Sequence, residues 1–387
     1  MKKMRNLWTL LFSLLILSAC NDLNESPETI DPSLTFEAVS QTFSGKIDPY
    51  EVFNYEGLSY PNYITKDNTG ANSLTNEGAT LGRVLFYDKA LSVNNNISCA
   101  SCHQQQHAFS DVAIQSEGVA GVTGRHSMRL INARFADEEN FFWDERANSL
   151  EAQTTQPIQD HIEMGFSGAD GDPSLNDLVL KLSEIPYYSE LFEWVYGDTI
   201  ITEDRMQKAL AQFVRSIQSF DSKFDEGLAQ SNNLNGNFTN YTAQENLGKQ
   251  LFLDPPNRGG AGCQGCHRAP EFDIDPNSGN NGVISVLGSA ESDLNVTRAP
   301  SLRDVFNGNG ELNGALMHDA SLASMLEVVE HYNQIQQNNT NLDNRLRGPN
   351  GLQNLGLTDN EKEAIVAFLK TLSGSEVYVA EQWSDPF

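Results

Sequence analysis

The sequence predicts a mainly helical protein that contains two homologous domains. The first observation is an internal repeat: the segments LGRVLFYDKALSVNNNISCASCH (81–103) and NLGKQLFLDPPNRGGAGCQGCH (246–267) share LG-x-x-LF-x-D followed by CxxCH. The second is a matching pair of later segments, ALAQFVRSI (209–217) and AIVAFLKTL (364–372), in which apolar residues recur three and four positions apart. Convincing alternating strand patterns are scarce. Each domain is therefore expected to begin and end with an amphipathic helix.

The N-terminal residues are expected to be an export signal followed by a tether. Residues 1–19 combine basic residues with an apolar run that falls short of the roughly 20 residues a membrane span needs. The run ends in LSAC at Cys20, which is typical of a lipoprotein signal; an uncleaved anchor or an ordinary signal is the alternative. We expect lipids on Cys20 to anchor the protein on the periplasmic side of a Gram-negative membrane. Residues 20–50, polar and without clear periodicity, are the expected flexible tether.

The rest of the 387-residue chain is long enough for two domains of ordinary size. An Asn-rich stretch at 230–243 is the expected linker between a first domain at 51–229 and a second domain at 244–387. Thr202 and Thr358 stand near the starts of the closing helices, each followed by acidic residues, and are the expected N-caps.

The formal net charge of −27 disfavours nucleic acid as a partner, because the protein would repel phosphate backbones. A basic soluble redox protein would be attracted instead. The same charge also serves simple solubility, so it does not by itself identify a partner.

Two CxxCH motifs use every cysteine except Cys20. They consist of Cys99, Cys102 and His103, and of Cys263, Cys266 and His267. Zinc would need both cysteine pairs to meet in one tetrahedral site, and a thioredoxin-like disulfide would need a strand-to-helix context that neither copy has. Covalent haem explains all three residues, because the thiols form thioethers and the histidine becomes the proximal iron ligand. We therefore expect two cytochrome c-like domains, each with one covalent haem c.

The segment FFWDERANSLEAQTTQPIQDHIEMG (141–165) is the most specific part of a resemblance to the bacterial di-haem cytochrome c peroxidases. This family includes the MauG branch, which oxidises tryptophans in another protein. The resemblance implies that the first haem reacts with peroxide, that Gln153 and Glu163 line its open face, and that Trp143 lies between the haems. Glu163 would be the general acid and base, taking a proton from peroxide and returning one to the leaving oxygen. Without the resemblance, Trp143 would be a core aromatic residue and Glu163 a surface carboxylate.

The second haem needs a sixth ligand if it is to pass electrons rather than bind peroxide. Tyr332 lies fourteen residues after His318, where the resemblance implies a methionine in the peroxidases proper and a tyrosine in MauG. Tyr332 is the expected ligand, with Met317 and Met325 as rivals. The difference matters because methionine raises the haem potential, whereas a phenolate stabilises ferric iron.

Two further assignments depend on the resemblance. Several members carry a mobile loop histidine that blocks the first iron, and the candidates for this role are His126 and His107. The family also binds calcium through an asparagine side chain, which Asn132 matches, and through backbone carbonyls at positions that correspond to Asn313 and Ala315.

The sequence is compatible with three functions. The first is a peroxidase that reduces hydrogen peroxide to water with electrons from a small donor protein of the cytochrome c or cupredoxin type. The second is a MauG-like enzyme that oxidises side chains of a partner protein, and the third is a non-catalytic di-haem electron carrier. A homodimer is one expectation for the assembled protein.

Overall fold

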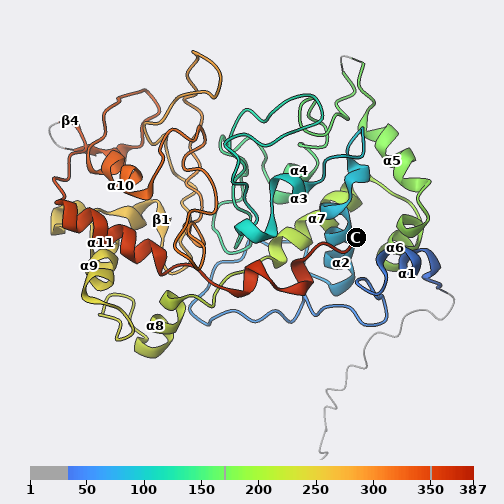
Figure 1. Ribbon diagram of the computed structural model, residues 1–387, viewed down its shortest axis with the longest axis horizontal. Helices are drawn as coiled ribbons and strands as arrows, with labels where there is room; N and C mark the ends of the chain where they lie inside the picture. Colours follow the sequence, from blue (N-terminus) through green and yellow to red (C-terminus); the bar gives the residue numbers. More distant parts are fainter. Residues whose placement is uncertain (1–33, 170, 349–350) are drawn as a thin grey trace, which may run out of the picture. The chain divides into compact units, whose positions relative to one another are not determined.

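The computed structural model describes residues 34–169, 171–348 and 351–387 (Figure 1). The expected signal, Cys20 and the tether up to residue 33 lie outside these residues. Within them the structure is mainly helical, which confirms the helical part of the predicted fold class. The α-helices are α1 (Glu37–Phe43), α2 (Asn76–Tyr87), α3 (Cys99–Cys102), α4 (Leu150–Thr154), α5 (Leu175–Ser183), α6 (Pro186–Tyr196), α7 (Glu203–Ser216), α8 (Lys223–Ser231), α9 (Ala243–Leu253), α10 (Met325–Asn333) and α11 (Asp359–Lys370).

The remaining regular elements are short. Two antiparallel pairs of two-residue strands occur, with His267 opposite Ile274 in the first pair and Arg347 opposite Leu352 in the second. The strands are β1 (His267–Arg268), β2 (Asp273–Ile274), β3 (Arg347–Gly348) and β4 (Gly351–Leu352). The 3₁₀ turns are η1 (Lys89–Leu91), η2 (Gln105–His107), η3 (Pro256–Arg258), η4 (Cys263–Gly265), η5 (Asn344–Leu346), η6 (Glu376–Tyr378) and η7 (Glu381–Trp383).

The sequence repeat becomes a repeat of helix pairs, α2 with α7 and α9 with α11. The glycine of each repeated LG lies where the paired helices touch. A Cβ atom on Gly82 would lie 2.0 Å from the carbonyl oxygen of Ala209, and one on Gly248 would lie 1.8 Å from that of Ala364. Since no Cβ can approach a carbonyl oxygen so closely, only glycine permits these crossings.

The helices begin at the residues that the cap signals predict. The Thr202 side chain accepts a hydrogen bond from the backbone N–H of Arg205, and Thr358 forms a reciprocal capping box with Glu361. Both predicted N-caps are confirmed.

Residues 36–50, expected to belong to the flexible tether, are folded. Val39 and Phe43 of α1 are buried, and the Glu190 carboxylate on α6 accepts hydrogen bonds of 2.9 Å from the backbone N–H groups of Ala38 and Val39. The tether prediction is therefore wrong for these residues, because their few apolar positions, spaced as one helix face, are obscured by polar neighbours.

The expected linker at 230–243 is also packed. Phe238 is buried in a core with Phe252 and Phe368, and the Lys249 ammonium donates to the carbonyl oxygens of Leu234 (2.7 Å) and Gly236. These contacts fix the polar segment against α9.

The last residues of the expected second domain return to α2. The Tyr87 hydroxyl donates to the carbonyl oxygen of Trp383 (2.6 Å), and Arg83 donates to that of Ser384 (2.7 Å). Trp383 is itself buried. Residues Phe36–Phe387 form one compact unit, so the sequence boundary at 244–387 does not separate every contact. None of the helices in the described ranges is long and apolar enough to cross a membrane.

Candidate active site

The first CxxCH faces a cavity of about 600 Å³. Its cysteines lie on the single turn of α3, which is capped where the backbone N–H of Ser98 donates to the Ser101 hydroxyl (3.0 Å). Cys99 and Cys102 are free thiols, and burial raises the pKa of Cys99 to about 12. Burial lowers the pKa of His103 to about 4, so its imidazole is neutral. The motif thus presents two thiols and a neutral imidazole to one cavity.

The His103 ring is oriented by its own loop. Its Nδ1 lies 3.3 Å from the carbonyl oxygen of Phe109, to which a protonated Nδ1 donates. A neutral imidazole then carries its lone pair on Nε2, which is the arrangement of a histidine that ligates metal.

The second CxxCH faces a cavity of about 790 Å³. Cys263 lies on η4, while His267 begins β1, and both line this cavity together with Cys266. Burial raises the pKa of Cys263 to about 12 and lowers that of His267 to about 4. The two motifs therefore offer the same donor set in the same electrostatic state.

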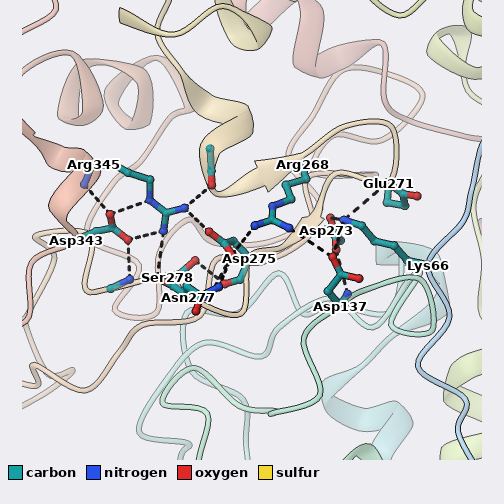
Figure 2. Close-up of polar contacts among 12 residues, drawn as sticks. Lys66, Asp137, Arg268, Glu271, Asp273, Asp275, Asn277, Ser278, Asp343 and Arg345 are labelled. Atoms are coloured by element: carbon teal, nitrogen blue, oxygen red, sulfur yellow. Dashed lines mark hydrogen bonds and ion pairs between the residues drawn. The ribbon is translucent and has the colours of Figure 1, made fainter.

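Arg345 holds the second CxxCH loop in place (Figure 2). Its guanidinium donates to the backbone carbonyl of Gly265 inside the motif, to the Asp275 carboxylate, and to both oxygens of Asp343 at 2.8 and 2.6 Å. Asp343 and Arg345 both line the second cavity. The loop conformation is therefore fixed by contacts with a segment about 80 residues away in sequence.

The same charged network extends to the first cavity (Figure 2). Lys66 lies 2.9 Å from Asp273, 3.5 Å from Asp137 and 3.9 Å from Glu271, and Asp137 also pairs with Arg268 (3.4 Å). Asp273 lines the first cavity although it belongs to β2, beside the second motif. Burial raises the pKa of Asp273 to about 6, while Lys66 opposes that rise.

Gln153 and Glu163 both line the first cavity, so the structure brings them together with the first CxxCH. Gln153 lies on α4. Glu163 lies in a later turn, where its own backbone N–H donates to the Asp160 carboxylate (3.0 Å). Burial, assisted by the Asp160 charge, raises the pKa of Glu163 to about 7, and Arg146 opposes this shift. Glu163 also lines an adjoining pocket of about 290 Å³, which shares Arg146, Pro157 and Asp160 with the cavity.

Trp143 lines both cavities and is fixed by hydrogen bonds at both ends of the residue. The indole Nε1 donates to the His126 carbonyl oxygen (2.8 Å). Its own carbonyl oxygen accepts from the backbone N–H groups of Thr297 (3.0 Å) and Arg298 (3.1 Å). The centroid of its ring lies 6.2 Å from that of His318. Trp143 is thus held by segments from both halves of the chain.

His126 is better placed than His107 to approach the first cavity. His126 lines both cavities, whereas His107 lies on η2 outside their described linings. The His126 Nδ1 lies 3.0 Å from the Ala113 carbonyl oxygen, and its Nε2 is buried with no hydrogen-bond partner in the part of the chain that the structure describes. A neutral ring that donates from Nδ1 has its lone pair on Nε2. Whether His126 blocks the first iron stays a prediction.

The three candidate sixth ligands, Tyr332, Met317 and Met325, all line the second cavity. The Asn281 side-chain N–H group donates to the Tyr332 hydroxyl (3.2 Å) and also lies 3.4 Å from the Met317 sulfur. Burial raises the pKa of Tyr332 above its usual value, and the Asn281 hydrogen bond opposes this. The sixth ligand therefore remains a prediction, with Tyr332 and Met317 sharing one amide.

The expected calcium ligands lie in separate polar contacts. The Asn132 amide exchanges hydrogen bonds with the backbone of Ser219 at 2.8 and 3.1 Å. The side-chain oxygen of Asn313 is buried and has no hydrogen-bond partner within the described ranges, and Ala315 lines the second cavity. The described residues contain no cluster of three or more His, Cys, Asp or Glu side chains suited to a metal ion. A site built on an amide and carbonyl oxygens is of another kind, so calcium stays a prediction.

The residues fit two haem groups. Each cavity lies within the range of roughly 300–1,000 Å³ typical of cofactor sites, and each presents two free thiols beside a neutral imidazole. Arg129 and Arg298 line both cavities, and each has a buried guanidinium nitrogen for which the described residues supply no hydrogen-bond partner. The sequence pattern did not identify these two arginines, because no local motif distinguishes an arginine that faces a cavity.

Comparison with known proteins agrees with this geometry. The family described as di-haem cytochrome c peroxidase matches residues 76–233. The methylamine utilization protein MauG of Methylophilus methylotrophus is 29% identical over 321 residues, which cover 80% of this chain and 86% of the relative. The cytochrome c551 peroxidase of Nitrosomonas europaea is 31% identical over 312 residues, which cover 77% and 80%. The crystal structure of a MauG-like protein associated with microbial copper homeostasis superimposes with a TM-score of 0.66 at 26% identity, covering 85% of this chain and 99% of that one.

Proposed function

The chain belongs to the di-haem cytochrome c peroxidase family and is a peroxidase-like oxidoreductase, and we propose that it reduces hydrogen peroxide to water with electrons from a small donor protein. Two covalent haems c, each in a cytochrome c-like domain and held by one CxxCH, supply the redox-active iron when bound. The proposal depends above all on one observation. Glu163, a carboxyl group whose pKa is raised to about 7, lines the same cavity as Cys99, Cys102 and His103.

Glu163 is suited to move a proton within peroxide. Reduction of hydrogen peroxide requires a proton to leave one oxygen and to reach the departing oxygen. A group with a pKa near 7 both accepts and returns a proton close to neutral pH. The Gln153 amide lines the same cavity and can hydrogen-bond to peroxide to orient it. We assign the adjoining pocket, which Glu163 also lines, as the entry route for peroxide.

Trp143 is the residue we assign to electron passage between the cavities. Among the described residues it is the one Phe, Tyr or Trp side chain that lines both. Its hydrogen bonds with the backbone of His126, Thr297 and Arg298 hold the residue in position beside both cavities.

A MauG-like enzyme that oxidises side chains of a partner protein is the second candidate. The specific observation in its favour is that Tyr332, rather than a methionine, occupies the expected position and lines the second cavity. The family membership disfavours the third expectation, a non-catalytic electron carrier. Periplasmic location through a lipid on Cys20 is also part of the proposal, and it depends on residues 1–20 of the sequence alone.

Steady-state turnover separates the two candidates. The protein, produced with a cytochrome maturation system, is mixed with a reduced c-type cytochrome and hydrogen peroxide, and donor oxidation is followed. The proposal predicts two donor molecules oxidised per peroxide, because each donor gives one electron. Negligible donor oxidation in a protein whose haems are both reducible would overturn the peroxidase assignment and favour the MauG-like one.

A further inference from the structure

Arg129 and Arg298 are two arginines that line both cavities. Arg298 is only 6% exposed. Its backbone N–H donates to the carbonyl oxygen of Trp143, which places it beside the residue common to the two cavities. Each arginine therefore presents its positive charge to both cavities.

In each of these two arginines, part of the guanidinium group has no hydrogen-bond partner among the described residues. In Arg298 both Nε and one terminal nitrogen are buried without a hydrogen bond, and in Arg129 the Nε is. Arg129 donates from another nitrogen to the Ser301 carbonyl oxygen (3.0 Å). Burial lowers the pKa of both arginines to about 10, so they remain charged near neutral pH. An unpaired buried charge is strongly unfavourable, and natural proteins pair such groups.

Arg303 shows how this chain treats a buried arginine that belongs to the protein core. It is fully buried and donates to both Asp225 oxygens (2.9 and 3.0 Å) and to the Pro270 carbonyl oxygen (2.9 Å). Asp225 raises the pKa of Arg303 despite burial. The contrast between Arg303 and Arg298 indicates that the partner of Arg298 is not a carboxylate of this protein.

Two glutamates are the alternative partners: Glu138, which is fully buried, and Glu145, which is half-buried. Glu138 and Glu145 interact electrostatically with Arg298, and each has one buried carboxylate oxygen without a hydrogen bond. No ion pair joins Arg298 to either of them within the described part of the chain, and neither glutamate lines a cavity there. The Arg298 side chain instead lines both cavities, which are the spaces that the haem macrocycles would fill.

We propose that Arg129 and Arg298 form an anion-binding pair between the cavities, and that their ligands are the propionate carboxylates of the two bound haems. Arginine presents a planar set of donors that matches a carboxylate, and the propionates would supply acceptors for the guanidinium nitrogens that have none among the described residues. The inference rests on the haem binding of the proposed function. It adds a role for these residues in setting haem potentials.

The test compares haem reduction potentials in the haem-loaded protein and its variants. A nearby positive charge favours the reduced iron, so Arg298→Gln and Arg129→Gln should each shift the potential of at least one haem to more negative values. Arg298→Lys keeps the charge and should retain most of the wild-type potential. Arg83→Gln is the matched control, because Arg83 is buried at 1% exposure, donates to Ser384 and lies outside the described cavity linings.

A second readout reports the ligand directly. The resonance Raman bands of the propionate groups should move in Arg298→Gln and stay unchanged in Arg83→Gln. Unchanged potentials and bands in both Arg298→Gln and Arg129→Gln would overturn the proposal. If Arg298→Gln prevents maturation, Arg129→Gln and Arg298→Lys still decide between these outcomes.

Two additional measurements exclude other partners. If Glu138→Gln abolishes the effect of Arg298→Gln, Glu138 is the true partner and the proposal fails. If the wild-type potential depends on chloride or phosphate at constant ionic strength, and Arg298→Gln loses that dependence, a free anion occupies the pair instead. None of these measurements requires turnover, so a failure of the peroxidase assignment with intact haems would leave the inference standing.

Discussion

The indole nitrogen of Trp143 donates a hydrogen bond of 2.8 Å to the backbone carbonyl of His126. The backbone N–H of His126 in turn donates to the His318 carbonyl oxygen (2.9 Å). The proposed electron relay and the candidate blocking histidine are therefore joined through one loop. A displacement of this loop would break the hydrogen bond that fixes Trp143.

Trp143→Phe should slow peroxide turnover about tenfold, since it keeps an aromatic ring but removes the hydrogen bond to His126 and the more easily oxidised indole. Stopped-flow reoxidation of the second haem after peroxide addition measures the effect. Trp194→Phe is the control, because Trp194 lies on α6 and packs against Phe36. Equal rates in Trp143→Phe and wild type would show that electrons do not pass through this residue.

Glu163→Gln should lower kcat for peroxide reduction by about 10²–10⁴-fold, the range typical of a lost general acid and base. The amide keeps the shape of the side chain, so haem content and the spectra of both haems should not change. Glu184→Gln alters an exposed glutamate and should have wild-type activity. A loss of less than about threefold in Glu163→Gln would remove this residue from the chemistry.

The pH dependence should follow Glu163. Because the deprotonated carboxylate takes the proton from peroxide, kcat/KM for peroxide should rise as pH increases through about 7. Folding stability should change in the opposite direction. The folded-state pKa lies above the ordinary value of 4.5, so stability is lost as pH rises from about 4.5 through about 7, where the buried group becomes charged. Urea unfolding across this range should show a smaller change in Glu163→Gln; an identical pH profile would contradict the assigned shift.

Tyr332→Phe should change the absorption spectrum and reduction potential of the second haem, because it removes the expected ligand oxygen. Met317→Leu is the matched variant at the other side chain that contacts Asn281, and it should leave both properties close to wild type. The reverse pattern would assign the sixth ligand to Met317.

Gly248→Ala should destabilise the protein by about 1–3 kcal/mol, the usual cost of forcing an extra methyl group into a packed contact. The new Cβ would lie 1.8 Å from the Ala364 carbonyl oxygen, so α9 and α11 must separate. Gly308→Ala is the control: Gly308 is exposed, and no atom lies within 4 Å of the Cβ position. Thermal unfolding of the haem-loaded protein measures both, and equal midpoints would show that the crossing adapts without cost.

Local sequence patterns were sufficient to predict the features that depend on neighbours in the chain. The caps at Thr202 and Thr358, the amphipathic helices of each repeat and the two CxxCH motifs follow from local spacing, because one helical turn or one loop contains every interacting group. The placement of Gln153 and Glu163 at one cavity was predicted only through the family resemblance. Helical periodicity could not relate them, since Pro157 and a turn separate them.

Contacts between side chains that are far apart in the chain became apparent only in the folded structure. It placed α1 against α6, returned Trp383 to α2 and joined Asn281 to both Tyr332 and Met317. It also left two buried nitrogens of Arg298, beside both cavities, without a hydrogen-bond partner among the described residues. No sequence pattern encodes these contacts, because they depend on how distant segments pack rather than on the spacing of residues within one segment. Arg303 and Arg298 illustrate the reason: the two arginines lie five positions apart, and only the fold gives a carboxylate to one and two cavities to the other.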